Sequence, residues 1–252
     1  MNRNELEDSW RREEQEPFAG WDFSHLKGRL LEDNPPWSYP ARAAELLRRS
    51  AAVVDLGTGG GERLLELREA WPVKVAATED HPPNVRLAAE RLAPLGVRVI
   101  NVSASPDASW PFADGEFDLV LNRHSAINAP EIARILAPGG TFLTQQVHGM
   151  WAHDLLAVFG AKPQWPWATP ATYVPQLEAA GLQAVAIKEW QGRLVYTDVG
   201  AIVYHLKAVP WMVPGFSVKD HRRCLHELHD RLESGTPLSF FAALYRIEAR
   251  KT

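Results

Sequence analysis

Apolar residues recur with two different periods along the middle of this chain. Short, nearly continuous apolar runs predict buried strands at residues 52–56, 74–78, 97–102, 117–122 and 141–146. Leu, Ile and Ala at helical spacing predict helices between these strands at residues 63–70, 84–92 and 129–136. Alternation of strand and helix predicts parallel pairing with helices on both faces, which is a doubly wound α/β sheet. In such a sheet, ligands bind beyond the carboxyl ends of the strands.

The N-terminal region departs from this alternation. Residues 4–15 predict a short charged helix carrying Leu6 and Trp10, which we interpret as a solvated or frayed terminus. Residues 18–40 mix Gly and Pro with aromatic side chains and predict an ordered aromatic loop. A helix is predicted at residues 41–49. We therefore expect a cap or lid segment over residues 1–40, followed by one domain over residues 41–252.

The pattern changes again after residue 146. It predicts helices at residues 153–159 and 174–180, the second with Pro175 in its first turn, and strands at residues 182–190 and 240–249. An insert over about residues 191–236 separates these strands. Within the insert we predict a short strand at residues 194–196 and helices at residues 199–208 and 218–233.

Composition narrows the class of protein. The 252 residues are 46% hydrophobic and 23% charged, as expected of a folded globular chain. A formal charge of −4 argues against the basic surface typical of sequence-independent nucleic-acid binding, so nucleic acid is an unexpected partner. The single cysteine, Cys224, excludes an internal disulfide, and we expect a cytoplasmic protein. The charged N-terminus does not resemble a secretory signal, and we see no run of about 18 apolar residues to cross a membrane.

A glycine-rich loop follows the first predicted strand. The sequence Val-Val-Asp-Leu-Gly-Thr-Gly-Gly-Gly-Glu covers residues 53–62, and its glycines allow a tight turn against a ligand before the next helix. A dinucleotide fingerprint would need glycine where Glu62 stands. The carboxylate of Asp55 suits a ligand with an ammonium or sulfonium charge better than it suits a pyrophosphate.

A second acidic residue closes the next predicted strand. Glu79 can accept hydrogen bonds from both hydroxyls of a ribose, and Asp80 would replace it if the strand ended one residue later.

Together, these residues resemble the class I S-adenosylmethionine-dependent methyltransferases. The resemblance extends through Pro-Phe-Ala-Asp-Gly-Glu-Phe-Asp-Leu-Val at residues 111–120 and Leu-Ala-Pro-Gly-Gly-Thr at residues 136–141. It implies a Rossmann-like, seven-stranded, mostly parallel sheet whose last strand is antiparallel. It also implies S-adenosyl-L-methionine as cofactor and S-adenosyl-L-homocysteine as product.

The resemblance assigns roles by position to residues after the strands. Asp55, Gly57, Thr58 and Gly59 are expected to line the methionine portion of the cofactor, and Glu79 or Asp80 the ribose. After the third strand the chain has Ser103 and Ala104 where many relatives have an acidic residue, so a serine hydroxyl or backbone groups would hold the adenine.

Methyl transfer from a sulfonium is an in-line displacement, so a protein contributes alignment and, where the acceptor carries a proton, a base. Asn122, Arg123 and His124 follow the fourth strand, where many relatives keep a motif that faces the substrate. We also expect Asn122 near the cofactor. His124 is the best base by chemistry, although it could equally cap the helix that follows. Arg123 could hold an acidic substrate or pair with a structural carboxylate.

Other polar and aromatic residues are candidates for contact with the acceptor. Gln146 and His148 lie at the end of the fifth strand, and Tyr196 lies at the beginning of the insert. Trp21, Trp37 and Tyr39 could stack on a flat substrate or form a local apolar cluster.

The histidines of residues 218–233 lack the spacing of a helical zinc pair, so no metal is expected.

Three functions of different classes follow. The first is a methyltransferase acting on a small molecule, favoured by the acidic balance and the aromatic segment. The second is an RNA methyltransferase similar to those modifying guanine in ribosomal RNA, for which we find neither a basic stripe nor a cysteine-rich zinc module. The third is a protein that binds the cofactor or its product without turnover.

Overall fold

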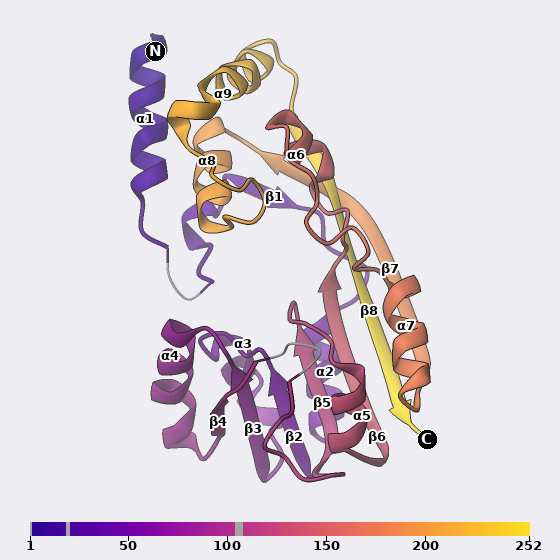
Figure 1. Cartoon of the computed structure of the whole chain (residues 1–252). Coiled ribbons are helices and arrows are strands. Elements are labelled where there is room, and N and C mark those ends of the chain that lie inside the picture. The colour runs from indigo at the N-terminus through magenta and orange to yellow at the C-terminus, as the bar shows by residue number, and fades with distance from the viewer. Residues whose placement is uncertain (1, 19–20, 104–107) are drawn as a thin grey trace. The chain divides into compact units, whose positions relative to one another are not determined.

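The computed structural model describes residues 2–18, 21–103 and 108–252 (Figure 1). Its α-helices are α1 (Arg3–Gln15), α2 (Tyr39–Leu47), α3 (Glu62–Glu66), α4 (Pro82–Leu92), α5 (Ala129–Ile135), α6 (His153–Val158), α7 (Pro170–Ala179), α8 (Val199–Ala208) and α9 (Val218–Glu233). Its strands are β1 (Leu30–Glu32), β2 (Ala52–Leu56), β3 (Lys74–Glu79), β4 (Arg98–Asn101), β5 (Phe117–Arg123), β6 (Leu136–Val147), β7 (Leu182–Tyr196) and β8 (Leu238–Lys251). Short 3₁₀ helices lie at Ser24–Leu26, Arg68–Ala70 and Ala93–Leu95.

The chain divides into two units, each built from several segments. The core unit comprises Pro36–Val147, Ala168–Trp190 and Leu244–Thr252. The accessory unit comprises Met1–Pro35, His148–Trp167 and Gln191–Ala243. The predicted cap over residues 1–40 and the domain over residues 41–252 stay predictions. Met1–Pro35 share a unit with two later segments of the chain.

The strand order is β1-β7-β8-β6-β5-β2-β3-β4. In the core unit β2 pairs in parallel with β3 and β5, β3 with β4, and β5 with β6, while β8 pairs antiparallel to β6. This confirms the doubly wound, mostly parallel α/β sheet. Within the described residues the sheet has eight strands rather than the expected seven, because β1 adds an antiparallel strand beside the end of β7 that lies in the accessory unit.

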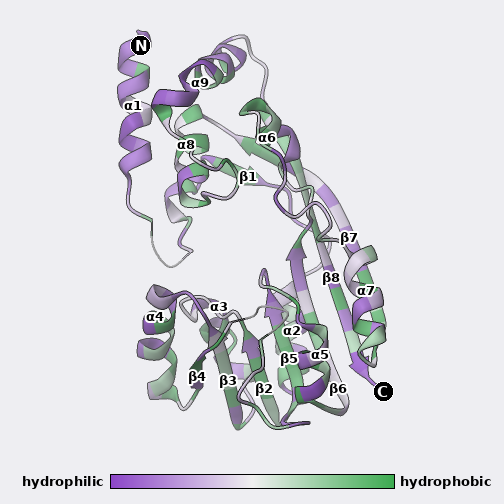
Figure 2. Cartoon of the chain, in the orientation of Figure 1, coloured by the Kyte–Doolittle hydropathy of each residue, from purple (hydrophilic) through white to green (hydrophobic). Residues whose placement is uncertain are grey.

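Alternate residues of the buried strands serve the two faces of the core sheet. Val53 packs in an apolar cluster with side chains of α2, α3 and α4. Its neighbour Val54 packs in a second cluster with side chains of α5 and α7. Because both faces are covered, these strands are apolar throughout, which is why the sequence pattern locates them well. Figure 2 shows hydrophobic residues, in green, in the core strands and hydrophilic residues, in purple, along most of α1.

The N-terminal helix is a packed part of the accessory unit, which corrects the expectation of a solvated terminus. Asn2 and Glu5 form a capping box at the start of α1. Leu6 and Trp10 are buried, and α1 contacts both α8 and α9. The ring of Trp10 meets that of His226 edge-on at a centroid distance of 5.0 Å, so apolar burial fixes this helix.

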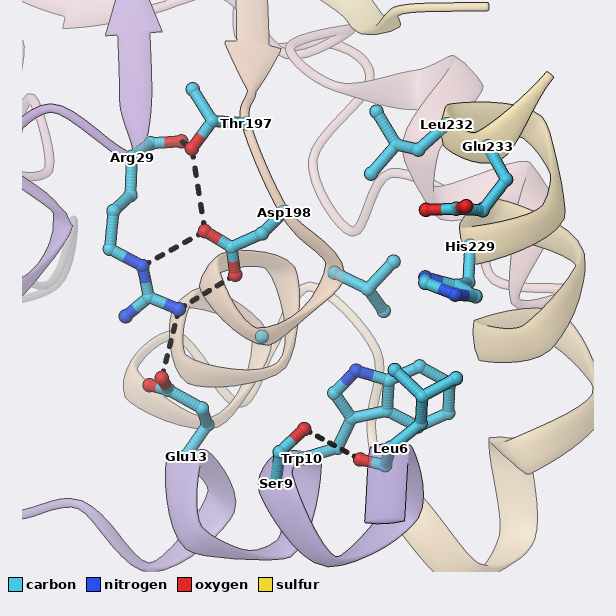
Figure 3. Close-up of a pocket in the computed structure, with 12 residues that line it drawn as sticks. Leu6, Ser9, Trp10, Glu13, Arg29, Thr197, Asp198, His229, Leu232 and Glu233 are labelled. Atoms are coloured by element: carbon cyan, nitrogen blue, oxygen red, sulfur yellow. Dashed lines mark hydrogen bonds and ion pairs between the residues drawn. The ribbon is translucent and has the colours of Figure 1, made fainter. Parts of the chain in front are cut away.

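Ion pairs join α1 to the rest of the accessory unit. Arg29 donates to both oxygens of Asp198, at 2.7 and 3.0 Å, and pairs with Glu13 at 2.8 Å. These residues line one side of a cavity of about 500 Å³, whose other side carries Trp10 and His229 (Figure 3). The ion pairs occupy the Arg29 guanidinium, while the Glu233 carboxylate lines the cavity on the side of His229 (Figure 3).

Some sequence predictions were wrong in their boundaries. The strands predicted at residues 182–190 and 194–196 are one strand, β7. Helix α7 begins at Pro170, so Pro175 lies inside it rather than in its first turn. The region of residues 18–40 contains strand β1 in addition to irregular backbone.

Candidate functional site

The glycine loop lies where the sequence placed it, between β2 and α3. Gly57, Gly59 and Gly61 adopt φ angles of 66°, 64° and 85°, a region that favours glycine. The amide of Gly57 donates to Thr78 Oγ1 at 3.2 Å, and the amide of Thr58 donates to the Thr78 carbonyl at 2.9 Å. The end of β3 therefore holds the first half of the loop.

Glu79 is the last residue of β3, as predicted, but its carboxylate faces the protein backbone. Oε2 accepts from the Gly59 amide at 2.7 Å, while Oε1 accepts from the amides of Asp80 at 3.1 Å and His81 at 2.9 Å. The side chain is 7% exposed. A carboxylate offers about four acceptor positions, so Glu79 has about one left for a ligand. Asp80 is exposed.

The loop lies at the point where the strand order of the sheet reverses. From β2 the chain continues to β3 and β4 on one side, whereas β5 and β6 lie on the other. Such a switch point is the usual ligand site of doubly wound sheets. Here the loops after β2 and β5 approach closely, because a Cβ placed on Gly57 would lie 2.3 Å from Ser125 Oγ.

Asp55 and Thr58 put polar atoms beside this turn. Burial raises the pKa of Asp55 to about 6, and the nearby Glu79 carboxylate also raises it, while the Thr58 hydroxyl and Arg123 act in the opposite direction. Thr58 Oγ1 is buried beside the Asp55 carboxyl, so the two side chains form one polar pair at this turn.

The end of β5 rests on a buried amide network that the sequence did not predict. Asn122 Oδ1 accepts from Thr144 Oγ1 at 2.8 Å and from Gln146 Nε2, and Asn122 Nδ2 donates to the Ala126 carbonyl at 3.1 Å. Gln146 also donates to the Ser125 carbonyl at 2.9 Å. Asn122 is fully buried, so it and Gln146 hold the backbone of residues 124–126 in place.

Tyr39 supports the same strand end from α2. Its hydroxyl donates to the Asn122 carbonyl at 3.3 Å, and burial raises its pKa well above the ordinary value. Trp37 donates from Nε1 to Gln145 Oε1 at 2.9 Å. These two aromatic candidates therefore lie in the core unit, beside the ends of β5 and β6.

His124 has strained backbone geometry for a side chain of its kind. Its φ angle is 57°, in the left-handed region that non-glycine residues rarely adopt, and such strain gathers at functional sites. Desolvation, followed by the positive charges of Arg123 and Arg63, lowers the pKa of His124. Its side chain is exposed, so desolvation lowers this pKa less than full burial would.

Arg123 has no carboxylate within ion-pair distance in the described part of the chain. Desolvation and the charge of Arg63 lower its pKa, while Tyr39 and Asp55 act to raise it. Its positive charge therefore faces the same region as the Asp55 carboxylate.

The remaining candidates divide between the two units. Ser103 follows β4 and accepts from Trp110 Nε1 through its carbonyl at 2.9 Å, while Ala104 lies outside the described residues. Trp21, His148 and Tyr196 belong to the accessory unit. Tyr196 is buried, with its hydroxyl 2.6 Å from His205 Nδ1, and His148 Nδ1 accepts from the Met150 amide at 3.1 Å.

No group of three His, Cys, Asp or Glu side chains suited to a metal ion occurs in residues 2–18, 21–103 and 108–252. Within the same ranges, no helix combines the length and apolar character needed to cross a membrane.

The part of the chain that carries this site is similar to known proteins. Residues 53–140 match the family model described as a methyltransferase domain. A ribosomal protein L11 methyltransferase of Bradyrhizobium diazoefficiens is 37% identical over 123 residues, which are 45% of this chain and 40% of that protein. A 23S rRNA (guanine(748)-N(1))-methyltransferase of Streptomyces fradiae is 33% identical over 170 residues, which are 64% of this chain and 59% of that protein.

The fold has a similar counterpart among solved structures. A candidate methyltransferase from Bacillus halodurans superposes with a TM-score of 0.59 at 18% identity, covering 84% of this chain and 96% of that one. The curated relatives are longer than the segments they share with this chain, which span only about half of each. The sequence match over residues 53–140 therefore identifies a methyltransferase domain in the part of the chain that carries the glycine loop and Glu79.

Proposed function

We propose that this protein is an S-adenosylmethionine-dependent methyltransferase that acts on a small molecule. The observation that carries the proposal is the loop of residues 57–61, which is held by Glu79 at the switch point of the sheet. A Cβ at Gly57 would clash with Ser125, so glycine at this position is what lets the loops after β2 and β5 meet.

The residues of this loop suit the chemistry of that cofactor. The Asp55 carboxylate can pair with its ammonium group, and Arg123 supplies a cation for its carboxylate. Glu79 fixes the loop and has about one acceptor position left for a ribose hydroxyl. The exposed Asp80 can accept a hydrogen bond from the other hydroxyl. Ser103 follows β4, where the adenine is expected. When bound, the cofactor supplies an electrophilic methyl group on sulfur.

The protein's own contribution to transfer is alignment, with a base where the acceptor must lose a proton. The network of Asn122, Gln146 and Thr144 fixes the turn after β5 that carries His124. We therefore assign His124 the role of base and Asn122 the role of positioning residue.

Charge favours a small acceptor over a polyanion. Acidic side chains outnumber basic ones in both units, 15 to 12 in the accessory unit and 16 to 15 in the core unit. A nucleic-acid substrate gains much of its affinity from phosphate contacts with basic side chains. Neither unit offers the required excess of positive charge.

A guanine base of ribosomal RNA is the second candidate acceptor. It is favoured by the Streptomyces fradiae relative, whose match covers 64% of this chain and extends well beyond the 88-residue span of the family model. This relative supports ribosomal RNA as an acceptor to be tested beside small molecules.

The deciding experiment measures binding and transfer separately. Calorimetry with S-adenosylhomocysteine tests the loop, and failure of the wild-type protein to bind it would remove the proposed function. Transfer is then followed with cofactor labelled in the methyl group, offered with pooled metabolites in one arm and bulk ribosomal RNA in the other. Label in the metabolite pool supports a small acceptor, and label in RNA supports the second candidate. Binding with no transfer in either arm would indicate a protein that only binds the cofactor.

A further inference from the structure

A guanidinium from α4 contacts the second half of the glycine loop. Arg91 lies in the last turn of this helix, and its Nη1 donates to the Gly60 carbonyl at 2.9 Å. The same nitrogen pairs with the carboxylate of Glu62, which is the first residue of α3. One side chain therefore joins α4 both to the loop and to the helix that follows the loop.

The pair formed by Arg91 and Glu62 lies directly against Gly60. A Cβ placed on Gly60 would lie 2.5 Å from Glu62 Oε1 and 2.7 Å from Arg91 Nη1. Gly60 is buried, while the side chains of Arg91 and Glu62 are 39% and 42% exposed. The pair therefore covers the loop backbone at this position and is itself open to solvent.

The end of α4 is fixed by apolar packing next to this contact. Leu92 follows Arg91, is fully buried and shares an apolar cluster with Leu64 of α3. A Cβ on Gly61 would lie 2.8 Å from Leu92 Cδ1, so this helix packs directly on the loop backbone. Because Arg91 acts from a fixed position, its bond to Gly60 restrains the loop rather than the helix.

The two halves of the loop have different anchors. Thr78 and Glu79, at the end of β3, hold the amides of residues 57–59. Arg91 holds the next peptide group through the Gly60 carbonyl. A bond from a guanidinium to a carbonyl is charge-assisted and stronger than one between neutral groups. Loss of Arg91 would therefore free the second half of the loop while the first half stayed attached to β3.

Such a contact should act on ligand affinity more than on folding. Ion pairs between partly exposed side chains contribute little to the stability of a fold. A loop that is ordered before its ligand arrives loses less conformational entropy when the ligand binds, so the same contact raises affinity.

We propose that Arg91 is a positioning residue for the cofactor, and that with Glu62 as its partner it fixes residues 60–62 in their ligand-binding arrangement. This inference rests on the proposed function and adds a residue of α4 to its site. It also gives a role to Glu62, which stands where a dinucleotide fingerprint has glycine. A carboxylate at that position holds Arg91 beside the loop.

A matched pair of variants tests this role. Arg91→Ala and Arg86→Ala each remove one positive charge from α4, but Arg86 is exposed and only Arg91 carries the bond to the Gly60 carbonyl. In calorimetry we expect Arg91→Ala to bind S-adenosylhomocysteine about tenfold more weakly, because one charge-assisted hydrogen bond is lost. Arg86→Ala should bind it as the wild type does. The two unliganded variants should unfold at the same temperature. Equal affinity in both would overturn the inference.

Further variants separate the carbonyl bond from the ion pair. Arg91→Lys keeps a charged donor and should regain part of the affinity. Glu62→Gln keeps an acceptor for Arg91 without the charge and should cost less than Arg91→Ala. The double variant of Arg91→Ala with Glu62→Gln has no unpaired carboxylate beside the loop, and it should bind as weakly as Arg91→Ala. Full recovery in this double variant would overturn the inference, because the loss would then come from the unpaired carboxylate.

Hydrogen exchange of backbone amides shows where the change occurs. The Gly61 amide donates to the Thr58 carbonyl at 3.1 Å within the loop, whereas Val54 lies in strand β2. In unliganded Arg91→Ala, NMR should show faster exchange at Gly61 and unchanged exchange at Val54. Faster exchange at both amides would indicate a general loss of stability and would also overturn the positioning role.

The titration of the wild type distinguishes failure of this inference from failure of the proposed function. If the wild type does not bind S-adenosylhomocysteine, the proposed function fails and this inference fails with it. If the wild type binds and Arg91→Ala binds equally well, the proposed function stands and only the role of Arg91 is lost.

Discussion

The carboxylate of Glu79, at the end of β3, accepts a hydrogen bond of 2.7 Å from the backbone amide of Gly59 in the loop after β2. The residue that sequence reasoning assigned to a ribose is thus also the anchor of the loop that holds the rest of the ligand. Substitution of Glu79 therefore affects both the ribose contact and the anchoring of the loop, and a control variant is needed to separate the two.

Replacing Glu79 by Ala should weaken binding of S-adenosylhomocysteine by about 1–3 kcal/mol, because buried groups lose a charged hydrogen-bond partner. Isothermal calorimetry measures the change. Asp80→Ala is the matched control at the neighbouring, exposed position. If Asp80→Ala is the more damaging of the two, the ribose contact belongs to Asp80, and normal affinity in both variants would reject the assignment of this site.

A side chain at Gly57 should disrupt the switch point of the sheet. In Gly57→Ala the new Cβ would lie 2.3 Å from Ser125 Oγ, and the residue would keep a φ angle near 66°. We expect lower stability and at least tenfold weaker cofactor binding, measured by thermal unfolding and calorimetry. Adding Ser125→Gly should restore part of both, since it removes the clash but leaves the backbone strain of about 1–3 kcal/mol. No restoration would mean that the two loops do not meet as described.

Much of the core unit could be predicted because its physical causes are local. Strands β2, β3 and β5 are apolar on both faces, and the loop after β2 has three glycines at positive φ angles, so both leave clear marks in the sequence. Their order fixes the switch point, and the switch point locates the ligand loop.

Other features depend on contacts between distant residues. Strand β1 has three residues, and its Leu30 pairs with Tyr196, a partner that no local pattern identifies. The bonds of Asn122 to Gln146 and Thr144 depend on the register of two strands. Polar residues in these strands look like candidate catalysts in sequence, whereas their side chains support the backbone.

Cofactor binding should weaken in acid through Asp55. Its pKa is raised to about 6, so the carboxyl becomes neutral below that pH and can no longer pair with an ammonium group. We expect the affinity for S-adenosylhomocysteine to fall by up to about tenfold per pH unit below pH 6. In Asp55→Asn the affinity should be low and independent of pH over the same range. A wild-type affinity that is constant from pH 5 to 8 would contradict the role of Asp55.

Helix α1 should contribute strongly to the stability of the accessory unit. Trp10 is 2% exposed, and truncation of a buried Trp to Ala typically costs about 3–5 kcal/mol. Denaturant unfolding of Trp10→Ala should show a loss of this order. Arg3→Ala removes a side chain on the same helix that is 74% exposed, and it should leave the free energy of unfolding unchanged. If both variants were as stable as each other, α1 would be a frayed terminus that does not stabilise the accessory unit.

The pH dependence of transfer tests His124. An unperturbed histidine, with a pKa of about 6.5, would make the rate rise through neutral pH, because only neutral imidazole accepts a proton. Desolvation and the charges of Arg123 and Arg63 lower this pKa, so the rate should rise at a lower pH than it would with an unperturbed histidine and should be flat above about pH 7. It should fall only at more acidic pH.

His124→Asn is the suitable variant, since asparagine tolerates the φ angle of 57° and lacks a basic nitrogen. The single-turnover rate should fall by about 10²–10⁴-fold with unchanged affinity for S-adenosylhomocysteine if His124 is a general base. A rate close to that of the wild type in this variant would show that alignment alone suffices, and a profile rising near pH 6.5 would show that His124 keeps its ordinary pKa.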